Sequence, residues 1–256
     1  MLIGIMKFLI VHFITFSRVA TIFLLVAMTY PRVFAQVLPF HTYTTREGLP
    51  SNHITALSQD SKGFLWIGTD EGLSVYDGES FKTFTTVDGL VNPYVTAIIE
   101  SHKSPGTMWI ASIADGVTRY QDGVFTAVRF PSSSSRIFAG SIVEDQQGII
   151  WCVTSSGEFK IEGDTLRSFP LHPPEYISGN DVVLARDGKL WFGVNSRIHI
   201  FEPARQTKSV VELAFHPNGT INHMTVDREG DIWIIGKDST LRRFVGEHLL
   251  TTWESG

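Results

Sequence analysis

The heptapeptide Asp60-Ser-Lys-Gly-Phe-Leu-Trp66 recurs in four looser copies along this chain of 256 residues. Every copy ends in a tryptophan, and the spacings between the tryptophans are 43, 42, 40 and 42 residues. A glycine stands three residues before each tryptophan, and an acid stands six residues before it in three of the five copies. The five copies end at Trp66, Trp109, Trp151, Trp191 and Trp233. A repeat of roughly 40 residues indicates a solenoid, an array or a propeller.

The first full unit predicts four short strands. Residues 53–58 and 80–86 alternate apolar and polar side chains, which is the period of a β-strand. Residues 64–69 and 73–76 are mostly apolar and are bounded by turn residues, including the hairpin signal Asp77-Gly78. No stretch of ten residues beyond residue 36 carries a convincing helical period. The sequence therefore predicts an all-β fold, a β-propeller of four-stranded blades.

Five blades are predicted in residues 36–256, and together they form an incomplete ring. The predicted blades are about 46–86, 87–130, 131–170, 171–208 and 209–252. We expect the recurring tryptophans to wedge adjacent sheets together rather than to form a platform for a ligand, because the period that places them also buries them.

Residues 1–35 differ from the rest of the chain. They carry Lys7, Arg18 and Arg32 but no acid, and residues 19–28 are an apolar run. Val33 and Ala35 place small residues at the −3 and −1 positions of a cleavage site. This layout predicts a secretory signal peptide cleaved after Ala35. The alternative is an uncleaved N-terminal membrane anchor, and in both cases the remaining chain is exported.

Charge and cysteine content argue against nucleic-acid binding and against catalysis by a thiol. Removal of residues 1–35 takes the net charge from −5 to −8 and leaves no block of Lys or Arg, which argues against nucleic acid as a partner. The single cysteine, Cys152, follows Trp151 on a predicted strand, and no histidine stands near it in the sequence. We expect Cys152 to be a buried core residue rather than a catalytic thiol.

The first unit also carries a more specific pattern. It opens with Gly48-Leu-Pro-Ser-Asn-His-Ile-Thr-Ala-Leu-Ser-Gln-Asp60 and continues with Gly63-Phe-Leu-Trp-Ile-Gly-Thr69 and Gly72-Leu-Ser-Val-Tyr-Asp-Gly78. The chain strongly resembles the two-component regulator propeller repeat through these residues. The resemblance extends from Phe40 to Gly256 and is looser in units three to five, where the Gly-Leu opening is lost.

The resemblance implies an exported bacterial sensor. Propellers of this family usually precede an immunoglobulin-like domain, one membrane helix and a cytoplasmic histidine kinase, and many belong to hybrid systems that sense carbohydrate fragments. It therefore implies an oligosaccharide or other small ligand, downstream membrane and kinase domains, a homodimer, and a periplasmic location with tethering to the inner membrane. No cofactor is implied.

The two ends of the repeat region carry predictions of their own. Leu38-Pro-Phe-His-Thr-Tyr-Thr-Thr45 aligns with residues 80–86 and predicts an outer strand of a preceding blade. Residues 247–252 predict the fourth strand of the fifth blade, and Glu254-Ser-Gly256 resembles the start of another. We expect the chain to be the N-terminal fragment of a sensor histidine kinase or the product of a broken reading frame; the alternative is a genuine short protein whose end strands pair between chains or form a redundant strand.

The sequence offers no catalytic or metal-binding motif. The nine histidines are scattered; His199 stands alone on a strand, and His216 and His223 are seven residues apart. No His-x-His, His-Glu-x-x-His or Cys-x-x-Cys spacing occurs, so neither a metal site nor a catalytic residue is predicted. The sequon Asn218-Gly-Thr220 is interpreted as a turn.

If a ligand binds, propeller connectivity predicts the place. The loops between the second and third strands, and between the fourth strand and the next blade, share one face. They hold polar and aromatic residues suited to sugars: Asn52, Asp70, Glu71, Asn92, Tyr94, Asp115, Arg136, Tyr176, Asn195 and Asp238. Loop residues are also polar simply because they meet water, so no single position is assigned to ligand binding.

The leading hypothesis is a non-catalytic sensory module that biases a kinase when ligand binding shifts its packing against other domains or a second subunit. Two alternatives stay open. One is a secreted propeller enzyme acting on carbohydrate as a lyase or hydrolase, and the other is a scaffold propeller.

Overall fold

The computed structural model describes residues 40–113, 116–129, 139–154, 157–171, 179–213 and 219–254. The chain divides into two compact units, residues 1–42 and 43–256, and all described strands belong to the second. The predicted signal peptide, residues 1–35, lies outside the described residues. Among the described residues, no helix is long and apolar enough to cross a membrane.

Residues 43–256 form five four-stranded sheets, which we call blades 1 to 5. Blade 1 contains β1 (Ile54–Gln59), β2 (Leu65–Thr69), β3 (Leu73–Tyr76) and β4 (Phe81–Phe84). Blade 2 contains β5 (Val95–Glu100), β6 (Met108–Ser112), β7 (Gly116–Gln121) and β8 (Val124–Arg129). Blade 3 contains β9 (Ala139–Glu144), β10 (Ile150–Thr154), β11 (Gly157–Glu162) and β12 (Thr165–Ser168). Blade 4 contains β13 (Gly179–Leu184), β14 (Leu190–Val194), β15 (Arg197–Glu202) and β16 (Thr207–Glu212). Blade 5 contains β17 (Ile221–Val226), β18 (Ile232–Gly236), β19 (Thr240–Val245) and β20 (His248–Glu254).

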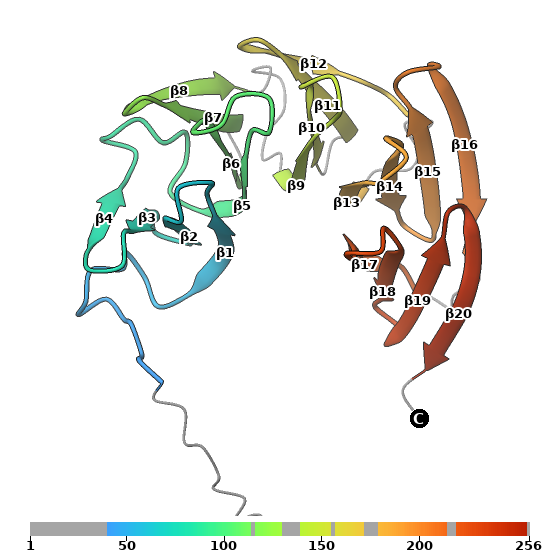
Figure 1. The fold of residues 1–256 in the computed structure, drawn as a ribbon, viewed down its shortest axis with the longest axis horizontal. Helices are drawn as coiled ribbons and strands as arrows, with labels where there is room; N and C mark the ends of the chain where they lie inside the picture. Colours follow the sequence, from blue (N-terminus) through green and yellow to red (C-terminus); the bar gives the residue numbers. More distant parts are fainter. Residues whose placement is uncertain are drawn as a thin grey trace, which may run out of the picture. The chain divides into compact units, whose positions relative to one another are not determined.

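Each blade is an antiparallel meander in which the strands pair in chain order. Neighbouring blades touch through their first strands, β1 with β5, β5 with β9, β9 with β13, and β13 with β17. Within residues 43–254 the blades follow an arc in chain order, and blade 1 does not meet blade 5 (Figure 1). The predicted all-β propeller with five blades in an incomplete ring is confirmed.

The recurring glycine and acid both serve the turn between the first two strands of a blade. The glycine three residues before each tryptophan has a φ between +84° and +94°, a conformation that glycine adopts without a Cβ clash. In blade 1, Asp60 Oδ1 accepts hydrogen bonds from the amides of Lys62 and Phe64 at 3.0 and 2.9 Å. Asp60 Oδ2 accepts a hydrogen bond from Trp66 Nε1 at 2.9 Å. The acid therefore shapes the turn and holds the indole ring with the same carboxylate.

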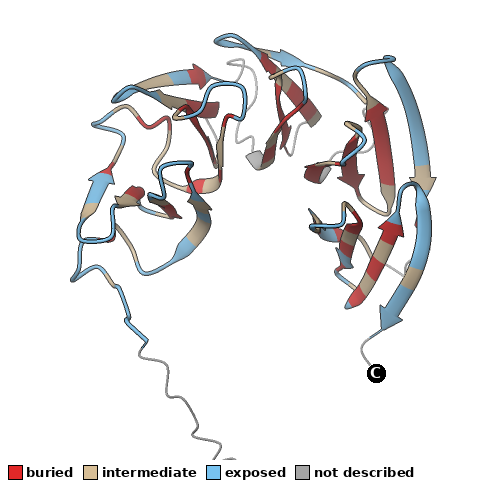
Figure 2. Cartoon of the chain, in the orientation of Figure 1, coloured by how far each residue is buried: buried red, intermediate tan, exposed pale blue. Residues whose placement is uncertain are grey.

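The tryptophans lie between blades, as predicted. Trp66, Trp109, Trp151 and Trp191 are at most 7% exposed, and each belongs to a core cluster that includes residues of the following blade. Trp151, for example, meets the rings of Phe192 and Phe201 in blade 4 at 6.2 and 5.5 Å between centroids. Figure 2 shows the most buried residues on second and third strands such as β14 and β15, whereas the outer strands β16 and β20 are largely exposed.

The two ends of the arc expose the faces that other blades bury. Leu57 in blade 1 is 63% exposed, whereas the residues at its position in blades 2 to 5, Ile98, Ile142, Val182 and Met224, are at most 7% exposed. At the other end, Trp233 is half-buried and stacks on Trp253 with 5.5 Å between ring centroids. Burial at these positions is therefore set by the adjacent blade and not by the residue type.

The structure differs from the sequence predictions at three places. Leu38–Thr45 was expected to form an outer strand, but the described part, residues 40–45, contains no strand. An outer strand pairs with the third strand of its own blade, and no such strand precedes it in the described chain. β16 runs to Glu212, past the predicted border at residue 208, and Glu254 pairs with Thr240 at the end of β20 instead of starting a new blade.

Cys152 is confirmed as a core residue. It lies on β10, is fully buried, and packs in the cluster that joins blades 2 and 3. Burial raises the pKa of the Cys152 thiol to about 12, so the nucleophilic thiolate is scarce at neutral pH.

Candidate functional site

The loop face is the end of the blades that carries the loops between second and third strands and the loops that lead into the next blade. Because each blade is an antiparallel meander, these two kinds of loop meet at the same end. Four side chains gather there between blades 1 and 2, and we call Ser51, His53, Asp70 and Tyr94 the loop-face cluster.

The cluster is held together by polar and ring contacts. His53 Nδ1 lies 3.2 Å from Asp70 Oδ2, although the two residues are 17 positions apart. The Tyr94 ring, from the loop into blade 2, meets the His53 ring edge to face with 6.4 Å between centroids. The main-chain N–H of His53 donates to Ser51 Oγ at 3.1 Å. The tertiary fold thus assembles one site from three loops.

The cluster is open to solvent and carries a negative charge. The His53 side chain is 62% exposed and that of Asp70 is 31% exposed. The pKa of Asp70 is lowered, first by a hydrogen bond from the Ser51 side chain and then by His53. The Asp70 carboxylate is therefore ionised at neutral pH, and it presents acceptor oxygens next to the imidazole that the Tyr94 ring contacts.

The other predicted loop residues have mainly structural tasks. Asn52 Oδ1 accepts from the amide of Thr45 at 3.0 Å, and Asn92 Oδ1 accepts from the amide of Tyr94 at 3.0 Å. Asp238 is nearly buried and accepts from Thr240 Oγ1 at 2.6 Å. Asn195 takes a left-handed turn with φ of 55°, and Glu71 is exposed beside the cluster. Asp115, Arg136 and Tyr176 lie outside the described residues.

Sequence reasoning missed His53 and Ser51. Both stand in the stretch 48–60 that carries the family resemblance, but His53 was interpreted as the start of a strand. The strand β1 starts one residue later, at Ile54, so the His53 side chain belongs to the loop. The late start of the strand was the signal that could have been used.

Within the cluster, the Ser51 hydroxyl is engaged by two neighbouring polar groups. It accepts from the main-chain N–H of His53 at 3.1 Å, and it donates to the Asp70 carboxylate rather than to an imidazole nitrogen, the partner that commonly activates a serine nucleophile. Within the described residues, no group of three or more His, Cys, Asp or Glu side chains is placed to hold a metal ion.

A second polar pair joins the inner strands of blades 4 and 5. The Asp181 carboxylate on β13 is nearly buried and accepts hydrogen bonds from the amides of Met224 and Val182 at 2.7 and 2.9 Å. Its Oδ2 also lies 2.6 Å from Nδ1 of His223, whose side chain is 64% exposed. Asp181 of blade 4 therefore binds the main chain of blade 5 and also contacts the exposed imidazole of His223.

The Asp181–His223 pair predicts a pH dependence of stability. The hydrogen bond to Asp181 raises the pKa of His223 above its unfolded value of about 6.5. A raised folded-state pKa contributes stability that is complete below about pH 6.5 and is lost as the pH rises through the folded value. We expect the urea midpoint to fall as the pH rises above 6.5, and His223→Gln to flatten that fall. An equally steep profile in His223→Gln, with exposed His248→Gln as the control, would contradict the assignment.

The comparisons with known proteins agree with the fold. Residues 48–71 match the family described as Two component regulator propeller. Over 43 residues the chain is 40% identical to histidine kinase P4 of Formosa agariphila, which is 17% of this chain and 3% of that protein. The extracellular domain of the hybrid two component system BT3049 from B. thetaiotaomicron has a TM-score of 0.67 at 20% identity, over 82% of this chain and 31% of that chain. Virginiamycin B lyase from Staphylococcus aureus has a TM-score of 0.65 at 17% identity, over 79% of this chain and 70% of that chain.

The comparisons with solved structures define the fold class of the chain. The likenesses to solved structures, all at or below 20% identity here, establish the β-propeller fold that sensors and lyases share. Within that fold, residues 48–71 match the two-component regulator propeller repeat, which confirms the resemblance noted for this stretch. The chain spans less than a third of the BT3049 extracellular domain and a small part of histidine kinase P4.

Proposed function

We propose that this chain is an exported ligand-sensing module of a two-component signalling protein, and that it catalyses no reaction itself. The observation that carries the proposal is the loop-face cluster, in which His53 and Asp70 of blade 1 face Tyr94 at the entry to blade 2. A ligand held by all three residues contacts two blades and therefore biases the packing between them. A sensor needs this kind of differential interaction with two arrangements of the protein.

The proposed ligand is an oligosaccharide. Sugars have hydroxyl groups that form hydrogen bonds with carboxylate oxygen atoms and imidazole nitrogen atoms. They also have apolar ring faces that stack on an aromatic side chain. Asp70 and His53 supply the polar partners, and Tyr94 supplies the ring. The kinase output is proposed to reside in other domains of the full protein, by analogy with the two-component relatives, and the reading frame downstream of residue 256 tests this part.

Calorimetric titration of the purified chain against a panel of oligosaccharides tests ligand binding. For a glycan that binds, we expect Asp70→Ala and Tyr94→Ala each to weaken the affinity about tenfold or more, because each removes a direct contact worth roughly 1.4 kcal/mol. Glu79→Ala is the matched control, since Glu79 is an exposed acid in the hairpin between β3 and β4, at the opposite end of the same blade.

Two results would count against this assignment. Affinity that is unchanged in both loop-face variants would remove the cluster from the binding site. An equal loss in Glu79→Ala would point to a general charge effect instead. Export has a separate test, because N-terminal sequencing of the mature protein is expected to start at Gln36.

A further inference from the structure

In blades 1, 3 and 5, the turn between the first two strands contains an aspartate whose carboxylate binds the indole N–H of the recurring tryptophan. Trp151 Nε1 donates to Asp145 Oδ2 at 2.7 Å, and Trp233 Nε1 donates to Asp227 Oδ2 at 2.7 Å, as Trp66 does to Asp60 in blade 1. In blades 1 and 3 the acid satisfies a donor that the following blade removes from water. Without such an acceptor, a buried N–H group costs free energy.

Blade 2 lacks the acid but receives a carboxylate from its neighbour. The turn of blade 2 is two residues longer, so Ser101, the residue after β5, takes the place that Asp60 takes after β1. Ser101 Oγ donates to Glu144 Oε1 of blade 3 at 2.8 Å. The amide of His102 also donates to the Glu144 carboxylate, at 2.5 Å. Glu144 is the last residue of the first strand of blade 3, and its carboxylate enters the turn of the preceding blade.

Blade 4 has neither of these carboxylates. Ala185 stands at the acid position, and the residue of blade 5 that corresponds to Glu144 is Val226, the last residue of β17. Trp191 is 1% exposed, and its Nε1 is buried without a hydrogen-bond partner. The backbone of the turn is unchanged, since the amide of Gly188 donates to Ala185 O at 2.9 Å, as that of Gly148 does to Asp145 O.

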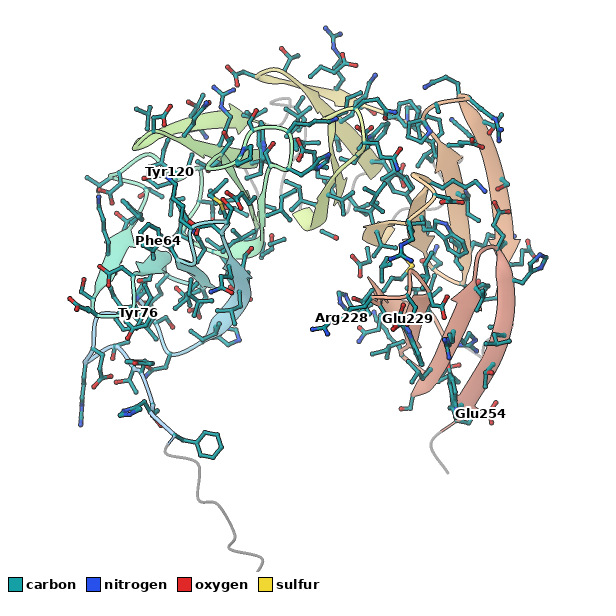
Figure 3. The ribbon with its side chains drawn as sticks, viewed as in Figure 1. Phe64, Tyr76, Tyr120, Arg228, Glu229 and Glu254 are labelled. Atoms are coloured by element: carbon teal, nitrogen blue, oxygen red, sulfur yellow. The ribbon has the colours of Figure 1, made fainter. Side chains whose placement is uncertain are left out.

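A cavity lies at this place between blades 4 and 5. Its volume is about 350 Å³, and Ala185 and Trp191 are among its lining residues. The corresponding cavity between blades 1 and 2, which Asp60 and Trp66 line beside the labelled Phe64 and Tyr120 (Figure 3), has a volume of about 240 Å³. The larger cavity is the one that lacks the carboxylate.

The charged groups around the cavity are mostly paired. Arg186 donates to the carbonyl oxygens of Glu229 and Arg228, both labelled in Figure 3, at 2.9 and 3.1 Å. Asp187 lies 3.2 Å from Lys189 Nζ, and Asp231 accepts from Arg243 Nε at 2.8 Å. An entering anion therefore meets acids that cations already neutralise, apart from the exposed Glu229 side chain.

We propose that the cavity between blades 4 and 5 binds a small carboxylate in the place of the missing aspartate side chain. The carboxylate accepts a hydrogen bond from Trp191 Nε1 and a second from the amide of Asp187, which corresponds to the Lys62 amide in blade 1. Because Trp191 Nε1 lies below the protein surface, the ligand is of the size of formate or acetate.

Nuclear magnetic resonance of the indole N–H groups tests the proposal. The protein is titrated with sodium formate against sodium chloride of the same ionic strength, and the Trp191 resonance, one of six indole signals, is identified with Trp191→Phe. We expect a saturable shift of that resonance alone and a rise in the thermal midpoint with formate concentration. Ala185→Asp is expected to move the same resonance without formate, to raise the thermal midpoint by a few degrees, and to abolish the response.

Val226→Glu provides a second variant, because it places a carboxylate at the position of Glu144, which accepts from the Ser101 hydroxyl and the His102 amide in the turn of the preceding blade. It is expected to abolish the formate response as well. A non-saturable shift, an unchanged response in Ala185→Asp, or an equal response to neutral formamide would each overturn the proposal. These outcomes do not depend on glycan binding at the loop-face cluster. The proposal of a carboxylate site and the proposal of a glycan site are therefore tested independently.

Discussion

Trp151→Ala is expected to lower the free energy of unfolding by about 3–5 kcal/mol, the usual cost of removing a fully buried large aromatic side chain. Trp151 is 2% exposed and meets the rings of Phe169, Phe192 and Phe201. Its removal opens a cavity between blades 3 and 4, and it also deprives the buried Asp145 carboxylate of the indole donor. Urea unfolding followed by circular dichroism measures the loss.

Trp233→Ala is the matched control for this prediction. Trp233 stands at the same position of the repeat and makes the same indole hydrogen bond, to Asp227. No following blade covers it in the described chain, and its main neighbours are Trp253 and Arg243. We expect a loss of roughly 1–2 kcal/mol. Equal losses at the two positions would show that packing against the adjacent blade adds nothing to what the tryptophan contributes to the free energy of unfolding.

Gly68→Ile is expected to destabilise the chain by roughly 3 kcal/mol or more, at the upper end of the overpacking range. A Cβ atom at Gly68 would lie 2.6 Å from Val95 Cγ1 and 3.0 Å from Ala56 Cβ, so β2 and β5 would have to separate. Gly68 stands two residues after Trp66, on the side that meets blade 2. The same measurement of urea unfolding applies.

Position 235 provides the reciprocal test. Ile235 stands two residues after Trp233 in blade 5 and is 44% exposed. Ile235→Gly is expected to change the free energy of unfolding by only about 1 kcal/mol, the span of strand propensity at an exposed site. A small effect of Gly68→Ile would mean that blades 1 and 2 separate more easily than their packing indicates.

The candidate site was only partly predictable. Connectivity predicted which loops share one face, and Asp70 and Tyr94 of the loop-face cluster were among the residues expected there. His53 was missed because a strand boundary cannot be placed to one residue from alternation alone. The roles of Asn92 and Asp238 in shaping their own loops also require coordinates, because a polar loop residue looks the same in sequence whether it faces a ligand or its own backbone.

The sequence by itself determined the repeat, the four strands in each unit and the turn chemistry, because these depend on residues close together along the chain. The glycine before each tryptophan and the aspartate at Asp60 and Asp145 act within seven residues, and their tasks follow from spacing. Tertiary structure alone decided which equivalent residues are buried. Leu57 and Ile98 occupy the same position, yet one is 63% exposed and the other 7% exposed, because a preceding blade covers only the second. The state of the Trp191 N–H also required coordinates, because the absence of an acid at Ala185 does not by itself show whether another group supplies an acceptor.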